Sequence, residues 1–276
     1  MKGYRIPQLV HFYASHDMIQ AHTKLPELAS ARAGLLCAFM SRNHAKLGEL
    51  PEVVTSLVQL ALDTHDTVEL ASDHGDDRNM RSRQLKVLAG DYFSSRFYHL
   101  LAQAGQIEAI QLLSRAVCEV NRMKMTMVDK MKQFRMTAES YISDKTKLKQ
   151  CVFQAWDTHM SAHDVELWGK ALHELSKLEV VEQETERASA YSAFDGSYGY
   201  WRILQQGTRE ERELLMNRAW DEDTWKGLMK KYQVQHVLQD MLKQARRQVE
   251  EVLDECKRQL HLDIEVIKNE VPSFSS

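Results

Sequence analysis

Two aspartates and a histidine near position 65 are of the types that bind metal ions. Asp63 and Asp66 are three positions apart, and His65 stands between them. On a helix this spacing places both carboxylates on one face, where they could hold one hard cation such as Mg²⁺ weakly. His65 would face elsewhere, so a combined ligand set is not expected. The alternative is that both aspartates are simply solvated beside a polar loop.

A second unusual segment, VLAGDYF, begins at Val87. It places Gly90 and Asp91 side by side in an otherwise apolar helix, although both residues lower helix propensity. We expect Gly90 to permit close helix packing and Asp91 to hydrogen-bond to a neighbouring helix. Basic residues nearby could bind a diphosphate, because guanidinium groups match phosphate oxygens, or could be solvated: Arg78, Arg81, Arg83 and Lys86. The loop acids Asp73, Asp76 and Asp77 are expected to be solvated.

Two predicted helices position these segments. Pro51 suits the first turn of a helix, where its missing N–H is harmless. The residues that follow it, up to Leu62, are apolar on most sides, which predicts a buried helix. A polar loop is predicted over 72–82, and a second helix over 83–105.

The remaining chain also predicts helices. Proline occurs at positions 7, 26, 51 and 272 only, so more than two hundred residues lack the main helix breaker. We predict an N-terminal arm (1–25), helices from Pro26 to about 41 and over 106–139, 145–160 and 164–187, a break with a short helix over 189–207, and a long helix over 234–260. Methionines 123, 127 and 131 would fill gaps in the core, or form a flexible wall beside an apolar ligand. The fold class is therefore all-α, with a single helical bundle over 1–270 and a frayed tail at 271–276.

Composition excludes several classes of protein. Hydrophobic residues make up 43% and charged residues 27%, as in ordinary globular proteins. The net charge of −3 gives no sign of nucleic-acid binding. No apolar run is long enough to span a membrane, and the N-terminus lacks the features of an export signal. The four cysteines are widely spaced, so we expect a cytoplasmic protein without disulfides or a zinc site.

An acidic helix end, a polar loop with arginines and an LAGD segment together resemble the first-motif region of trans-polyprenyl diphosphate synthases. In that family the helix ends in a DDxxD motif. Here Asp66 keeps the first aspartate, whereas Thr67 and Leu70 replace the second and third. Gly75 and Asp76 stand near the expected paired arginines. No GGKR-like segment and no second DDxxD are present.

With these departures, the chain is similar to one family: component I, the small non-catalytic subunit of heterodimeric heptaprenyl or hexaprenyl diphosphate synthases. The forms LDTHD and RQLKVLAGDYFS carry the resemblance, which is strong over Ser56–Gln103. Weak support comes from the apolar stripe over Trp168–Glu182. The resemblance implies an isoprenoid-synthase-like helical fold with degenerate aspartate-rich motifs. It also implies that this chain carries no catalytic residue and binds no metal of its own.

The implied role is structural and regulatory. Component II, the catalytic subunit, would bind the Mg²⁺ and the prenyl diphosphate, and the pair would condense isopentenyl diphosphate onto farnesyl diphosphate for menaquinone synthesis. This chain would help to set product length. The residues expected to shape the contact with component II are Leu57, Ala61, Leu88, Gly90, Asp91, Tyr92 and Phe93. Two alternatives stay open: an independently active prenyltransferase or terpene-synthase-like enzyme, and an unrelated helical adaptor.

Overall fold

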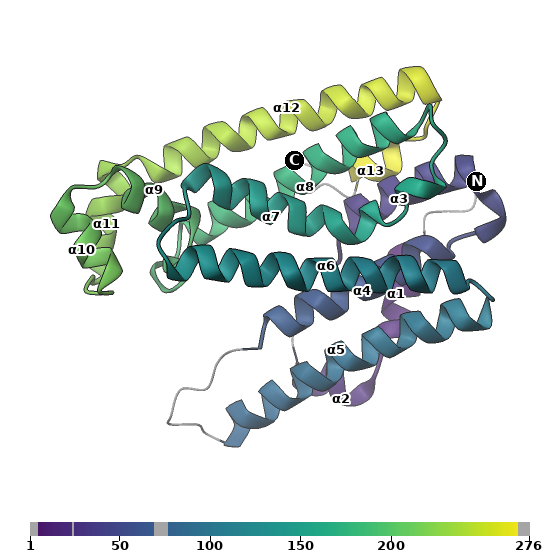
Figure 1. Cartoon of the computed structure of the whole chain (residues 1–276), viewed down its shortest axis with the longest axis horizontal. Helices are drawn as coiled ribbons and strands as arrows, with labels where there is room; N and C mark the ends of the chain where they lie inside the picture. Colours follow the sequence, from purple (N-terminus) through teal and green to yellow (C-terminus); the bar gives the residue numbers. More distant parts are fainter. Residues whose placement is uncertain (1–4, 24, 69–76, 270–276) are drawn as a thin grey trace. The chain divides into compact units, whose positions relative to one another are not determined.

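The computed structural model describes residues 5–23, 25–68 and 77–269. Every regular element in these ranges is a helix, as predicted, and none is a strand (Figure 1). No described helix is both long and apolar enough to cross a membrane. The α-helices are α1 (Ile6–Ala14), α2 (Asp17–His22), α3 (Ser30–Asn43), α4 (Leu50–Asp66), α5 (Asp77–Gln103), α6 (Ile107–Lys132), α7 (Ala138–Gln154), α8 (Val165–Arg187), α9 (Tyr198–Gln206), α10 (Arg209–Met216), α11 (Glu222–Lys231), α12 (Val234–Leu260) and α13 (Glu265–Asn269). Three short 3-10 helices are η1 (Ala45–Leu47), η2 (Asp157–His159) and η3 (Tyr191–Ala193).

The internal contacts divide the chain into two compact units. Unit 1 comprises the described parts of Met1–Cys118, Val152–Gly169 and Cys256–Ser276, and unit 2 comprises Glu119–Cys151 and Lys170–Glu255. Helices α6, α7, α8 and α12 each contribute residues to both units. The expectation of one domain over 1–270 stays a prediction.

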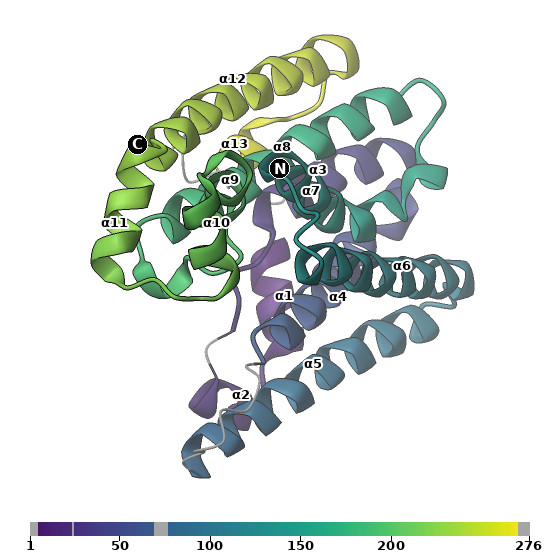
Figure 2. The ribbon, with the colours of Figure 1, turned by 60° about the vertical axis from the view of Figure 1, so that its left-hand side comes forward.

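Unit 1 is built around α4. Pro51 lies in the first turn of this helix, and every residue from there to Leu62 is buried, as predicted. The helix packs against α1, α3 and α5, and α5 runs beside it (Figures 1 and 2). The N-terminal arm forms α1 and α2, and α1 covers α4 with Ile6 and Val10. A helix surrounded in this way needs apolar residues on most of its sides.

Polar side chains fasten distant segments of unit 1. The indole N–H of Trp156 donates to Thr55 Oγ1 of α4 at 2.7 Å. The buried Asp164 carboxylate, just before α8, accepts a hydrogen bond from Arg42 Nε at 2.9 Å. Arg42 also donates to the carbonyl oxygen of Leu260, the last residue of α12, at 3.3 Å. These bonds tie α3 and α4 to segments more than a hundred residues away.

Unit 2 has a core rich in aromatic residues. Helix α9 contacts both α10 and α11, and Figure 2 shows the three short helices grouped together. The buried core residues include Phe194, Tyr200, Trp201, Leu215 and Leu238. The region predicted to be a break with a short helix is η3 followed by α9, which confirms that prediction.

A buried ion-pair network fixes the end of α8 in unit 2. The Glu184 carboxylate accepts hydrogen bonds from the Tyr141 hydroxyl (2.8 Å), the Tyr198 backbone N–H (2.8 Å) and the Arg187 guanidinium (2.9 Å). Arg187 donates further to the Tyr141 oxygen (2.7 Å) and to the Ala193 carbonyl (3.1 Å). Burial, together with the charge of Glu184, raises the pKa of Tyr141, so its hydroxyl keeps its proton. Each charged group in this network is paired.

Two predicted helix starts were wrong. Helix α3 begins at Ser30 and not at Pro26, and residues 25–29 are not helical. Helix α5 begins at Asp77, so the second half of the loop predicted over 72–82 is helical. That half contains Arg81 and Met80, which are good helix formers. The first half of the predicted loop lies outside the described residues.

The predicted helix 106–139 was wrong at its end. Helix α6 stops at Lys132, and Phe134 has a positive φ of 52°. Helix α7 starts at Ala138, earlier than the predicted 145, and ends at Gln154. Its start is capped reciprocally: the Ser140 N–H donates to Thr137 Oγ1 (3.1 Å) and the Thr137 N–H donates to Ser140 Oγ (2.9 Å). This cap fixes the start of α7.

Candidate functional site

The acidic residues predicted as candidate ligands lie at the end of α4. Asp63 is half-buried and accepts a hydrogen bond from the Gln59 side-chain amide, one turn earlier, at 2.8 Å. Asp66 is exposed. Thr67 follows the last residue of the helix, and its carbonyl oxygen accepts a hydrogen bond from Lys86 Nζ of α5 at 2.9 Å. Because a cation is favourable at a helix C-terminus, a lysine of the protein itself neutralises this helix end.

His65 connects α4 to α5. Its imidazole lies so close to Gly90 that a Cβ at position 90 would be 2.5 Å from His65 Nε2. The same nitrogen is 3.6 Å from Asp91 Oδ1, which makes a loose ion pair when the histidine is protonated. Gly90 therefore permits a close approach of the two helices, as the sequence predicted. Asp91 is exposed, and its contact with His65 of α4 is too long for the hydrogen bond that the sequence predicted.

The other predicted residues are divided between core and surface. Leu57, Ala61 and Phe93 are buried in unit 1. The side chain of Leu88, in contrast, is 61% exposed. Tyr92 is half-buried, and its ring lies 5.5 Å from that of His16, which precedes α2. The buried residues shape the packing of α4 and α5, whereas Leu88 is accessible to a second chain.

The basic residues near α5 have different roles. Lys86 binds the end of α4, which the sequence had not indicated. Arg81 is exposed and Arg83 half-buried, and neither forms an ion pair with another described residue. Arg78 and Asp77 belong to α5, but their side chains lie outside the described part, as do the predicted loop acids Asp73 and Asp76.

The described residues contain no cluster of three potential metal ligands. Mg²⁺ requires an octahedron of oxygen ligands, of which proteins usually supply one or two carboxylates besides the substrate's phosphates. Within residues 5–23, 25–68 and 77–269, no three His, Cys, Asp or Glu side chains are grouped to hold a metal ion. Asp63 accepts a hydrogen bond from Gln59, and Asp66 is exposed. That this chain binds no metal stays a prediction.

A buried arginine near this site was missed from the sequence. Arg32 of α3 donates a long hydrogen bond (3.5 Å) to Gln59 Oε1, and its guanidinium lies 4.7 Å from the centre of the Phe153 ring. Gln59 thereby joins Arg32 to Asp63. A positive charge thus stands behind the acidic end of α4. The available signal was a single arginine within the mostly apolar stretch of α3.

A buried glutamate in the first turn of α4 was also missed. Neither carboxylate oxygen of Glu52 has a hydrogen-bond partner among the described residues. Burial raises the pKa of Glu52 to about 7. Burial, with Glu52 nearby, also raises the pKa of the Cys37 thiol to about 11, so the thiol is unreactive. A charged residue within a helix that is apolar on most sides was the available signal.

In sequence, the chain is similar to proteins of one family. The family described as heptaprenyl diphosphate synthase (HEPPP synthase) subunit 1 matches residues 16–224. Heptaprenyl diphosphate synthase component 1 of Geobacillus stearothermophilus is 42% identical over 78 residues, which are 28% of this chain and 33% of that protein. The match therefore spans about a third of the length of this relative.

Solved structures share the fold at low sequence identity. The decaprenyl diphosphate synthase of Rhodobacter capsulatus aligns with a TM-score of 0.68 and 12% identity, covering 98% of this chain and 93% of that chain. For the heptaprenyl diphosphate synthase of Staphylococcus aureus the TM-score is 0.67 at 10% identity, with 98% and 94% covered. This chain therefore has the all-α fold of polyprenyl synthases. Because the family pattern extends over most of its length, the chain belongs to the heptaprenyl diphosphate synthase subunit 1 family.

Proposed function

We propose that this chain is the non-catalytic subunit of a two-chain heptaprenyl diphosphate synthase. It acts in the cytoplasm with a catalytic subunit, component II, which holds the Mg²⁺ and the prenyl diphosphate. Together they condense isopentenyl diphosphate onto farnesyl diphosphate, which supplies the side-chain precursor of menaquinone. Family membership supports this role.

The end of α4 is the observation that carries the proposal. In a synthase that ionises an allylic diphosphate, metal ions must stabilise the negative charge that develops on the leaving group. Here Gln59 and Lys86 bind the helix end instead, and Asp66 is the one motif aspartate retained. The described part of the chain keeps the helices of the site but has no cluster of ligands for this chemistry.

Reconstitution tests the proposal. This chain alone, component II alone and their mixture would each be assayed with Mg²⁺, farnesyl diphosphate and isopentenyl diphosphate. We expect activity in the mixture only, with a heptaprenyl product. Activity of this chain alone would instead show an independent prenyltransferase. Unchanged rate and product length on adding this chain to an active component II would also contradict the proposal.

The outer face of α5 is the proposed contact with component II. Val87 and Leu88 are exposed there, with Tyr98 further along the same helix. Exposed apolar residues that form a stripe on one helix are typical of an interaction surface. Leu57, Ala61 and Phe93 lie beneath this surface and support it without being accessible themselves.

A substitution on this face tests the contact. Leu88→Asp places a charge at an exposed position, so the fold should tolerate it while co-purification with component II is lost. Met216→Asp on α10 is the matched control, because Met216 is also an exposed apolar residue. If L88D bound and activated component II as well as the unmodified chain does, α5 would not be the contact.

A further inference from the structure

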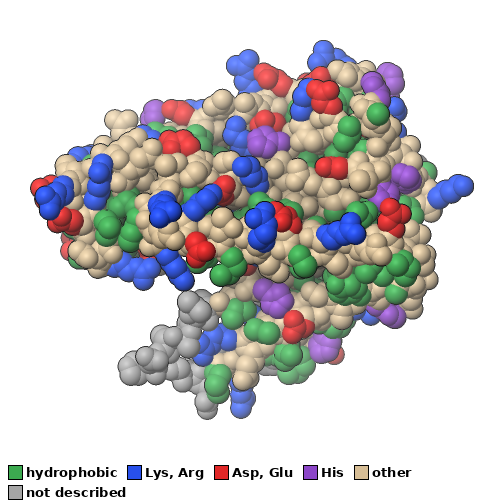
Figure 3. All heavy atoms as spheres, viewed as in Figure 1, with side chains coloured by type: hydrophobic (Ala, Val, Ile, Leu, Met, Phe, Trp, Pro, Cys, Tyr) green, Lys and Arg blue, Asp and Glu red, His purple; other side chains and the backbone are tan. Residues whose placement is uncertain are grey.

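The surface of α6 and α7 within unit 2 has a charge opposite to that of the whole chain. The chain carries a net charge of −3. Over residues 119–149, however, Lys and Arg outnumber Asp and Glu by eight to four. The cations are Arg122, Lys124, Lys130, Lys132, Arg135, Lys145, Lys147 and Lys149, and the anions are Glu119, Asp129, Glu139 and Asp144. Figure 3 shows Lys and Arg side chains along α6 and α7 on the face in view. Such segregation marks a binding surface for anions.

Part of this positive charge is not neutralised by the protein. Lys130 pairs with Asp144 at 2.8 Å, and Arg122 pairs with Glu119. Lys132, Arg135 and Lys147 are exposed, and none of them forms an ion pair with another described residue. Two of these cations flank the turn between α6 and α7, and the third lies further along α7. An external anion could therefore bind them without breaking an internal pair.

Apolar side chains are exposed among these cations. Met125 is 62% exposed, Val128 37% and Phe134 39%. Phe134 lies in the turn between Lys132 and Arg135 and adopts a φ of 52°, a left-handed conformation that is unfavourable for a bulky residue. A glycine could form the same turn without strain. The aromatic ring is thus held at the surface although the backbone conformation disfavours it.

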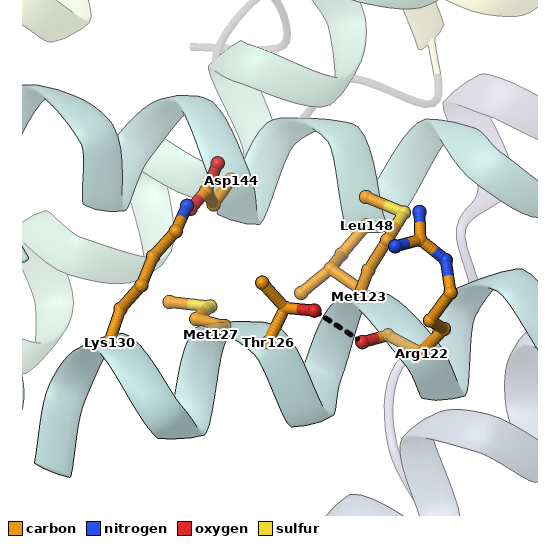
Figure 4. A pocket seen from close by; sticks show the side chains of 7 residues that line it. All are labelled: Arg122, Met123, Thr126, Met127, Lys130, Asp144 and Leu148. Atoms are coloured by element: carbon orange, nitrogen blue, oxygen red, sulfur yellow. Dashed lines mark hydrogen bonds and ion pairs between the residues drawn. The ribbon is translucent and has the colours of Figure 1, made fainter.

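A small slot opens on the side of α6 that faces α7, away from Met125 and Val128. It lies between α6 and α7 and has a volume of about 90 Å³. Met123, Met127 and Leu148 line it, while Arg122 and Lys130 lie at its two ends, as Figure 4 shows. Methionine side chains are flexible and adapt to apolar groups of irregular shape.

These features together select one kind of partner. Nucleic acid offers phosphates, but it would leave Met125, Val128 and Phe134 without apolar contacts. An anionic phospholipid bilayer offers phosphates for the cations and acyl chains for the apolar residues. We infer that the α6–α7 surface docks onto an anionic phospholipid membrane, with Phe134 entering the headgroup region and Lys132, Arg135 and Lys147 contacting lipid phosphates. This inference does not depend on the proposed enzymatic role.

Vesicle co-sedimentation of the full chain tests the inference. Vesicles of phosphatidylcholine alone would be compared with vesicles containing phosphatidylglycerol. We expect binding to the anionic vesicles only, and a decrease as salt is raised, because exposed charges are screened. Equal binding to both kinds of vesicle, or binding to neither, would overturn the inference.

Three sets of variants separate charge from apolar contact. Lys132→Gln, Arg135→Gln and Lys147→Gln combined should weaken binding by about 100-fold, since each cation near an anionic bilayer contributes about fivefold. Met125→Ser with Phe134→Gly should weaken it by about tenfold while keeping the turn. The matched control combines Lys226→Gln, Lys243→Gln and Arg247→Gln, which removes three exposed cations of α11 and α12 and should have little effect.

Two further outcomes decide against a lipid partner. Unchanged vesicle binding by the folded triple variant, with the unmodified far-UV circular dichroism spectrum and melting temperature, would overturn the assignment of the surface. Displacement of vesicles from the unmodified chain by component II would show that α6 and α7 form a protein interface, and would overturn it as well.

Discussion

Two glutamates buried in the two units show opposite environments. In unit 2, Glu184 accepts hydrogen bonds from a tyrosine, an arginine and a backbone N–H, so its charge is compensated. In unit 1, Glu52 is just as buried, but its carboxylate has no hydrogen-bond partner among the described residues. A buried carboxylate must be either paired or protonated. Glu184 is paired, whereas Glu52 destabilises the folded protein whenever its carboxylate is charged.

The comparison extends to the carboxylates at the end of α4. Asp66 is exposed, and Asp63 is half-buried and accepts a hydrogen bond from the neutral side-chain amide of Gln59. Residues that look chemically important in the sequence are therefore less buried than Glu184, which no motif indicated. We expect substitutions at these carboxylates to affect stability in the order of their burial and pairing.

The largest effect is expected at Glu184. Glu184→Ala removes the anion that Arg187 and Tyr141 contact and leaves their polar groups without this partner. We expect a loss of about 3–5 kcal/mol in the free energy of unfolding at pH 7, measured by urea denaturation. Glu186→Ala, an exposed neighbour on the same helix, is the control and should change it little. A loss below about 1 kcal/mol for E184A would mean that the network does not stabilise unit 2.

The effect expected at Glu52 depends on pH. Its pKa is raised from 4.5 to about 7. Between pH 4.5 and 7, therefore, Glu52 keeps its proton in the folded state but loses it in the unfolded state. Stability should therefore fall as the pH rises from about 4.5 to 7, by about 3 kcal/mol, and stay level above pH 7.

Glu52→Gln should remove this dependence and stabilise the protein at pH 8, as measured by urea denaturation at several pH values. Glu27→Gln, at an exposed position before α3, is the control. If E52Q and the unmodified chain lost equal stability between pH 5 and 8, Glu52 would not be the group that titrates.

A smaller effect is expected at Gly90. In Gly90→Ala the new methyl group meets the His65 ring, so we expect a net loss of about 1–2 kcal/mol in the free energy of unfolding. In a His65→Ala background the same change should instead stabilise α5, by up to about 1 kcal/mol, because alanine favours the helix. Gly169→Ala in α8, where no atom lies within 4 Å of the new Cβ, should also be stabilising. A loss of equal size in both backgrounds would exclude His65 as the cause.

The smallest effect is expected at Asp66. Asp66→Asn changes an exposed side chain, so the free energy of unfolding should change by about 0.5 kcal/mol or less. Millimolar Mg²⁺ should leave the melting temperature of both chains unchanged. A rise in melting temperature with Mg²⁺ that D66N abolished would show that the helix end binds the metal after all.

Features that depend on neighbouring residues were predictable from the sequence. The apolar breadth of α4 and the one-sided stripe of α12 indicated these helices because a helix repeats every 3.6 residues. The VLAGDYF segment indicated the close approach at Gly90. The start of α7 was missed although its signal is local: Thr137 and Ser140 cap each other within four residues.

Pairings between distant residues were not predictable in this way. Tyr141 and Glu184 are 43 positions apart, and no spacing rule indicates that the hydroxyl of one donates a hydrogen bond to the carboxylate of the other. Lys86 looked like a candidate for diphosphate binding until the structure placed its ammonium group at the Thr67 carbonyl. Only the tertiary fold decides whether a basic residue binds a ligand or a helix end.

Unit 1 is formed by segments that are far apart in the sequence, and this has a consequence for the order of folding. Arg42 binds the carbonyl of Leu260 across 218 positions, and Ile264 and Ile267 complete the buried core of this unit. Such non-local contacts raise the contact order and slow folding. During synthesis, unit 1 cannot close until the last helices have left the ribosome. Until then α3 and α4 expose apolar surface, so nascent chains and C-terminal truncations are the forms of this protein most exposed to aggregation.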